Sequence, residues 1–220
     1  MGEAIGGVLG LAAGVAISPV PIIAVILMLF STRAAVNGLS FLLGWIGGLA
    51  LVSWIVLAIG LGSPDDASGG GVAKVVIGVL FLLLALKQWR GRPGEGEVPS
   101  MPAWMGKIDR FTPVKACGLA LVLSSVNPKN LGLSIAAASS IGGVGLSAAG
   151  EAVAVAVYVF LASITLIVPV VGFLAGRKAM TPVLDNMKDW LTANNATVMA
   201  VLFLVLGAKV LGDGVTLLAS

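Results

Sequence analysis

Histidine is absent from this 220-residue sequence, and cysteine occurs once, at Cys117. A disulfide needs two thiols, and imidazole is the commonest ligand of transition metals. A disulfide relay, a metal site and a bound cofactor are therefore not expected. Charge is scarce as well, since only 10% of the residues are charged while 58% are hydrophobic and the mean hydropathy is +1.08. No soluble surface could cover so much apolar area, so membrane lipid is the expected solvent.

The sequence also lacks a recognisable catalytic grouping. It contains no nucleophile–base pair, no metal-binding cluster and no phosphate-binding loop. A single Ser or Asn in an apolar helix usually helps helices to pack. The pI of 9.2 does not indicate nucleic-acid binding, which would need a basic soluble surface. We therefore expect neither an enzyme nor a nucleic-acid partner.

Six apolar stretches are each about as long as the roughly 20 residues that a spanning helix needs. They are continuously apolar, whereas the strands of a membrane barrel alternate. The sequence thus predicts one all-α integral membrane domain, residues 1–220, with six transmembrane helices. The first stretch is too long for a signal-peptide core and is expected to be retained. The stretches are Glu3–Phe30, Ala34–Gly62, Gly71–Lys87, Pro113–Ser139, Glu151–Leu174 and Ala196–Leu211.

The basic residues predict the orientation of these helices. Ten of the thirteen lie in or beside the connections that follow the first, third and fifth stretches. Cytoplasmic loops of membrane proteins are enriched in Lys and Arg, so both termini are expected outside the cytoplasm. The ten are Arg33, Lys87, Arg90, Arg92, Lys107, Arg110, Lys115, Arg177, Lys178 and Lys188, whereas Asp65, Asp66, Lys74 and Glu151 lie on the opposite side.

Two prolines, Pro19 and Pro128, lie half a chain length apart at similar depths in the first and fourth stretches. Ser18 and Asn127 precede them, and such residues can cap a helix that begins with proline. Each pair predicts a new helix start in mid-membrane, although the prolines could merely kink packed helices. Since each half then holds three helices, the fold is expected to be a 3+3 inverted repeat with broken first and fourth helices: repeat one 1–89, a cytoplasmic linker 90–112 and repeat two 113–220.

Lys129 is the one ionisable residue expected near the bilayer centre. A charge there costs about 3 kcal/mol or more unless it is paired or hydrated, and no acidic residue lies at a comparable depth. Lys129 could attract an anionic group between the two helix starts, or it could snorkel or bind carbonyls that the helix break frees. The candidate substrate-binding residues are Ser18, Pro19, Pro21, Asn127, Pro128, Lys129 and Asn130.

Three further patterns predict packing and surface contacts. Glycines spaced by four residues are expected to let helices approach closely, and these are Gly6, Gly10, Gly14, Gly44 and Gly48. Pro102–Phe111 and Pro182–Leu191 resemble amphipathic helices on the cytoplasmic face, the second capped by Thr181. Arg90–Pro99 is expected to be a flexible linker.

The segment VNPKNLGLSIAAAS at 126–139 resembles the Asn-Pro-Lys signature of the LysE exporter superfamily, and ISPVPIIAVILMLFSTRAAVNGLSFLLGWIGG at 17–48 resembles its first helical hairpin. That superfamily usually has Gly-Pro where this chain has Ser18-Pro19. Most of the chain is more similar to the GAP branch, the glycopeptidolipid- and sulfolipid-addressing proteins of actinobacteria. The resemblance implies a plasma-membrane protein that helps to move cell-envelope lipids outward.

Three functions are consistent with these features. The first is a transporter or translocation helper for anionic or glycosylated lipids, with Lys129 supplying charge to the headgroup. The second is an exporter of small solutes such as amino acids, which would need carbonyls to bind the substrate ammonium. The third is a non-transporting scaffold for a large lipid exporter. Such an exporter and a second copy of the chain are the protein partners left open.

Overall fold

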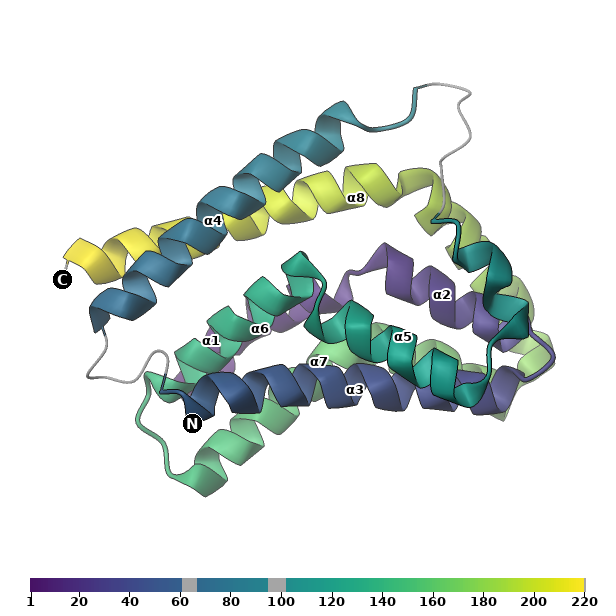
Figure 1. Ribbon diagram of the computed structural model, residues 1–220, viewed down its shortest axis with the longest axis horizontal. Coiled ribbons are helices and arrows are strands. Elements are labelled where there is room, and N and C mark those ends of the chain that lie inside the picture. Colours follow the sequence, from purple (N-terminus) through teal and green to yellow (C-terminus); the bar gives the residue numbers. More distant parts are fainter. Residues whose placement is uncertain (61–66, 95–101, 220) are drawn as a thin grey trace.

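The computed structural model describes residues 1–60, 67–94 and 102–219, and these residues form helices and connections without a strand (Figure 1). Among the helices in the described residues, only the short 3-10 helix η2 is not an α-helix. The elements are α1 (Gly2–Ala16), α2 (Pro19–Phe30), α3 (Ala34–Ala58), α4 (Ala67–Arg90), η2 (Met105–Arg110), α5 (Pro113–Ser125), α6 (Pro128–Gly142), α7 (Ala148–Ala175) and α8 (Arg177–Ala219).

Four of the described helices are long and apolar enough to cross a membrane: α3, α4 from Gly71, α7 and α8. The pair α1 and α2 brings the number to five if it forms one span, and its halves are bent by 57°. The predicted break in the first stretch is therefore confirmed. The fourth stretch is also divided, into α5 and α6, but these helices do not pass as a span. The predicted number of exactly six spans is not confirmed.

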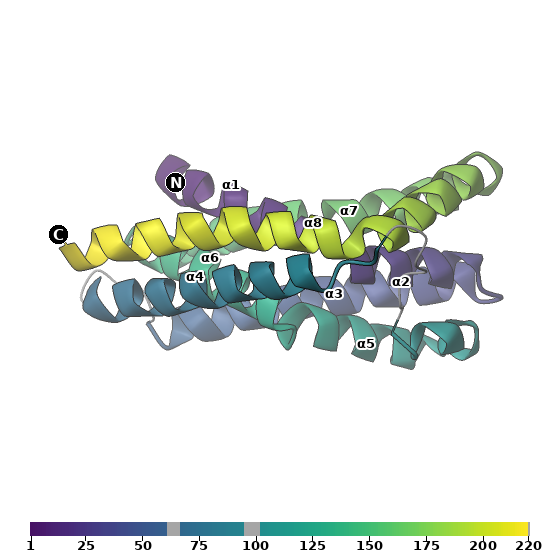
Figure 2. The same cartoon turned by 90° about the horizontal axis from the view of Figure 1, so that it is seen from above.

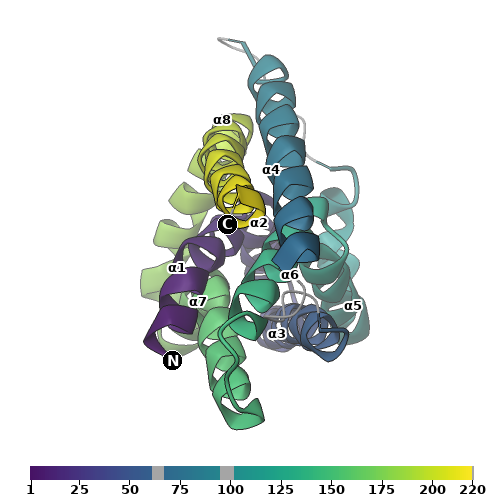
Figure 3. The same ribbon diagram turned by 90° about the vertical axis from the view of Figure 1, so that its left-hand side faces the viewer.

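Both termini lie at one end of the molecule, on the left of Figure 1, together with the connection between α6 and α7. The connections after α2 and α7 and the described parts of the connection after α4 lie at the other end, and most of the basic residues lie in or beside these connections. Helices α4 and α8 run side by side in opposite directions (Figure 2). Seen end-on, they form a layer over the remaining helices, in which α3 packs against α5 and α7, and α1 against α6 and α7 (Figure 3).

Glycines bring α3 against α5, as the spacing predicts. A Cβ atom added at Gly44 would lie 2.2 Å from the carbonyl oxygen of Cys117, closer than atoms can approach. One added at Gly48 would lie 2.0 Å from the Ser124 hydroxyl. Gly14 is equally enclosed, whereas Gly6 has nothing within 4 Å and Gly10 faces only the Lys209 side chain, at 3.9 Å. The packing role is confirmed for three of the five predicted glycines.

The segment Pro102–Phe111 folds as the short η2 instead of a full amphipathic helix. Its apolar side packs inward against α2, because Met105 and Ile108 are buried. The Asn37 amide of α3 donates a 2.9 Å hydrogen bond to the carbonyl of Phe111. This segment is therefore docked on the protein through the side that was expected to face lipid.

The prediction of a separate, Thr181-capped helix at Pro182–Leu191 is wrong. Helix α8 begins at Arg177 and continues through Pro182, and the Thr181 hydroxyl donates back to the Arg177 carbonyl at 2.8 Å. The amphipathic pattern persists within α8, since Leu184 is buried while Trp190 is exposed. The flexible linker predicted at Arg90–Pro99 is helical at its first residue, and its residues 95–99 lie outside the described residues, as do Asp65 and Asp66.

Candidate functional site

Lys129 is the second residue of α6, and only 2% of its surface is exposed. Its ammonium donates to the Gly14 carbonyl at 2.8 Å, the Ile17 carbonyl at 2.9 Å and the Ser18 hydroxyl at 2.6 Å. Three donated bonds are the full capacity of a lysine ammonium. Within the described ranges no carboxylate pairs with it. The Lys129 ammonium is therefore hydrogen-bonded to carbonyls that the helix break frees. This is the alternative to anion binding that the sequence analysis left open.

Ser18 and Thr165 complete the pairing around the first break. The Ser18 hydroxyl donates to the Val15 carbonyl at 2.6 Å, so it can accept the bond from Lys129. The Thr165 hydroxyl reaches across from α7 to the Ala16 carbonyl at 2.7 Å. Ser18 thus serves the end of α1, and the prediction that its side chain caps α2 is wrong. The carbonyls freed at this break are paired by protein groups, which matters where lipid offers no donor.

The second break is held by its own residues. The Asn127 side chain accepts a 3.0 Å bond from the backbone N–H of Lys129, which confirms it as the cap of α6. The fully buried Asn130 donates through its amide to the Leu123 carbonyl at the end of α5, at 2.9 Å. Its amide oxygen also lies 3.4 Å from the Ser18 hydroxyl, so the two breaks touch.

The two helix starts offer few free backbone donors. In α2, Pro19 and Pro21 carry no N–H group, so Val20 is the sole donor among the first three residues. In α6, Pro128 has none, and the N–H of Lys129 is taken by Asn127. Because orphan N–H groups carry the positive end of a helix dipole, an anion at this place would depend chiefly on the Lys129 ammonium.

A pocket of about 250 Å³ lies where the two helix starts meet α4 and α8. Six of the seven predicted site residues line it, namely Ser18, Pro19, Pro21, Asn127, Pro128 and Lys129. Asn130 does not line the pocket. The facing wall contributes apolar Leu84 from α4 and Met199 and Phe203 from α8. The pocket therefore combines one buried cation with an apolar wall.

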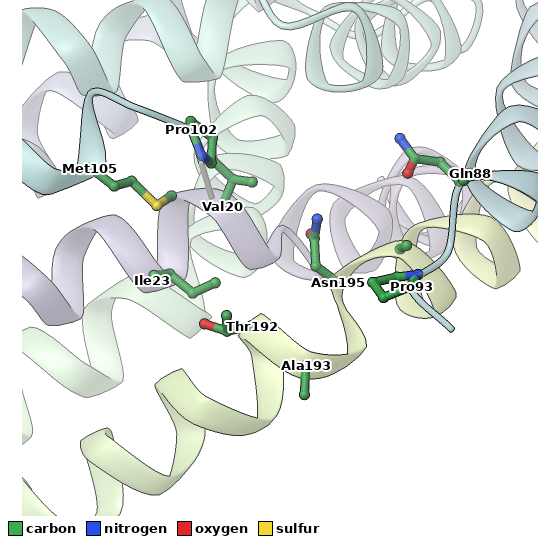
Figure 4. Close-up of a pocket in the computed structure, with 11 residues that line it drawn as sticks. Val20, Ile23, Gln88, Pro93, Pro102, Met105, Thr192, Ala193 and Asn195 are labelled. Atoms are coloured by element: carbon green, nitrogen blue, oxygen red, sulfur yellow. The ribbon is translucent and has the colours of Figure 1, made fainter. Parts of the chain in front are cut away.

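Two polar residues of this pocket, Gln88 of α4 and Asn195 of α8, were not predicted as site residues from the sequence. Together with Val20 they also line a second pocket of about 160 Å³ that reaches Pro93 and Pro102 at the basic end (Figure 4). The Asn195 amide oxygen is buried and has no hydrogen-bond partner in the part of the chain that the structure describes. A polar residue directly before the apolar run 196–211 was the available signal for Asn195.

The match to a known family covers nearly the whole chain. Residues 8–216 match the family described as Sap, sulfolipid-1-addressing protein. The chain belongs to this family. The resemblance to the sulfolipid-addressing branch is thereby confirmed, and no curated protein and no solved structure matches the chain. With its apolar helices, this member of the Sap family is a multi-pass membrane protein.

Proposed function

We propose that this Sap-family protein moves, or helps to move, anionic and glycosylated cell-envelope lipids outward across the bacterial plasma membrane. The observation that carries the proposal is Lys129, which lines a pocket and whose ammonium has no carboxylate partner among the described residues. A sulfolipid, the substance in the family's name, presents the opposite charge. The headgroup would occupy the pocket while its acyl chains remain in lipid.

Binding an anion at Lys129 requires an exchange of partners. All three hydrogens of the ammonium are already donated, so a headgroup oxygen must replace Ser18 or one of the carbonyls of Gly14 and Ile17. Charge-assisted bonds to an anion are stronger than bonds to neutral acceptors. The exchange would loosen the contact between the end of α1 and the start of α6. Headgroup binding is thereby coupled to the relative position of two broken helices.

The proposed architecture is an inverted repeat with both termini outside the cytoplasm. The helix packing supports it, because α3 of the first half packs on α5 of the second while α7 of the second half packs on α1 of the first. Helices α4 and α8, the last of each half, pack on one another. Basic segments gathered at the end opposite the termini support the orientation.

A scaffold for a larger lipid exporter is the second candidate. A groove of about 430 Å³ between α2, α7 and the first part of α8 is almost wholly apolar, and Val168, Val183 and Trp190 stand more than half exposed around it. A helix of a membrane partner could pack there. An amino-acid exporter has less support, because the carbonyls that its substrate ammonium would need are bonded to Lys129, Ser18 and Thr165.

Lipid-dependent melting of the purified protein tests the headgroup site. Sulfatide, a sulfated galactosylceramide, should raise the melting temperature more than galactosylceramide does. Lys129→Gln should abolish this preference because it removes the cation. The matched control is Lys209→Gln, which changes a half-exposed lysine of α8 that is paired with Asp213. This variant should keep the preference for sulfatide. Equal stabilisation of the wild type by both lipids, or a preference that survives Lys129→Gln, would contradict the proposal.

A second measurement separates carrier from scaffold. In liposomes that contain this protein alone, fluorescent sulfatide in the inner leaflet should become accessible to a membrane-impermeant quencher faster than in protein-free liposomes. An unchanged rate, with sulfatide binding intact, would favour the scaffold.

A further inference from the structure

Asn195 lines the same pocket as Lys129, and its buried amide oxygen has no hydrogen-bond partner among the described residues. We propose that Asn195 is a second point of headgroup recognition, which accepts a hydrogen bond from a hydroxyl of a lipid whose anionic group binds Lys129. This inference rests on the proposed function and deepens it, because it names the residue that would recognise a hydroxyl of the glycosylated headgroup.

The unpaired oxygen is costly to the protein when no ligand is bound. A buried acceptor without a donor has lost the hydrogen bonds of water and gained none in return, and native proteins rarely keep one without a reason. The terminal torsion of asparagine is broad, so rotation of the amide can turn its oxygen toward the pocket. Figure 4 shows the Asn195 side chain directed away from α8 into the space that the Gln88 amide enters from α4.

The residues around Asn195 favour a ligand whose hydrogen-bond donor is uncharged. A ligand ammonium would be repelled by Lys129, and none of the described residues that line the two pockets shared by Asn195 is a carboxylate. Hydroxyl groups donate without charge, and sugars present several of them. A headgroup with both a sulfate or phosphate and free hydroxyls would therefore satisfy Lys129 and Asn195 together.

Asn195→Leu provides the test, because it keeps a similar volume and removes the acceptor. The probes are sulfatide, which has sugar hydroxyls, and cholesterol sulfate, which has none. Loss of one hydrogen bond should weaken sulfatide binding about five- to tenfold, while binding of cholesterol sulfate changes less than about twofold. The lipid-free melting temperature should stay the same or rise, since an unsatisfied polar group has been removed.

Asn194→Leu is the matched control, because the Asn194 amide bonds to the Trp190 carbonyl within α8; it should leave the ratio of the two affinities unchanged. Sulfatide with O-methylated sugar hydroxyls, bound to the wild type, repeats the test without a variant and should bind as weakly as sulfatide binds Asn195→Leu. If Asn195→Leu or methylation leaves sulfatide binding unchanged while Lys129→Gln weakens both probes, Asn195 recognition is wrong and the proposed function stands. If Lys129→Gln weakens neither probe, the headgroup site itself fails.

Discussion

The two helix breaks have the same sequence pattern and are held together in different ways. At the first, the end of α1 takes its donors from elsewhere in the fold, from Lys129 of α6 and Thr165 of α7. At the second, Asn127 and Asn130 satisfy the break from within it. The first break therefore depends on tertiary contacts that a ligand could compete for, whereas the second is largely a local structure. This difference makes α1 the element expected to respond when a headgroup binds.

The largest expected effect comes from Lys129→Met, which removes the donor that links the breaks. It leaves the buried carbonyl of Gly14 and the partly buried carbonyl of Ile17 without this donor, and an unpaired buried acceptor costs about 1–3 kcal/mol. The free energy of unfolding, measured by reversible denaturation in mixed detergent micelles, should fall by at least about 2 kcal/mol.

The control is Lys209→Met, because that ammonium is 47% exposed and bonds to Asp213 within α8. A change of less than about 1 kcal/mol is expected there. Equal effects of the two substitutions would mean that the first break does not depend on Lys129.

A smaller effect is expected from Asn127→Ala, which removes the cap at the second break. Loss of an N-cap costs about 1 kcal/mol. Because the loss is local, hydrogen exchange should accelerate in the first turn of α6 and remain unchanged in α1. Ser18→Ala, in contrast, should leave the first turn of α2 as protected as before, since Ser18 does not cap it. Faster exchange at the start of α2 would show that Ser18 does act as a cap.

Both breaks lie at the predicted prolines, but the predicted side-chain cap is present only at the second. Asn127, Pro128 and their capping bond follow from local rules, because donor, acceptor and proline lie within three residues. The depth of Lys129 and the lack of an acid beside it were also evident. The partners of Lys129 could not be predicted from local sequence, since Gly14 lies in α1 and Ile17 and Ser18 lie at the break that follows it. Asn195 was missed because an unpaired acceptor is a property of a packed pocket.

The positions of the breaks are confirmed, whereas the predicted number of six spans is not. The stretch Pro113–Ser139 is predicted as one span with a break at Pro128. Because α5 is short and α6 carries Lys129, Asn130 and several serines, neither half has the length and hydropathy of a span. At the other extreme, the predicted span Ala196–Leu211 is the apolar part of the longer α8. Proline marked a boundary at positions 19 and 128 but not at 182, where the helix continues around it.

The smallest expected effect, and the finest test of the comparison, is Thr165→Val on α7. This nearly isosteric change removes the hydroxyl that donates to the Ala16 carbonyl at the first break. That carbonyl also accepts a 2.9 Å bond from the backbone N–H of Ser18, so it is not left unpaired. The free energy of unfolding should therefore fall by only about 0.5–1 kcal/mol. The control is Ser163→Ala. The Ser163 hydroxyl donates within α7 to the Val159 carbonyl, so this substitution should leave the free energy of unfolding nearly unchanged. If Thr165→Val is as neutral as that control, donors from α7 do not hold the first break, and its dependence on tertiary contacts reduces to Lys129 alone.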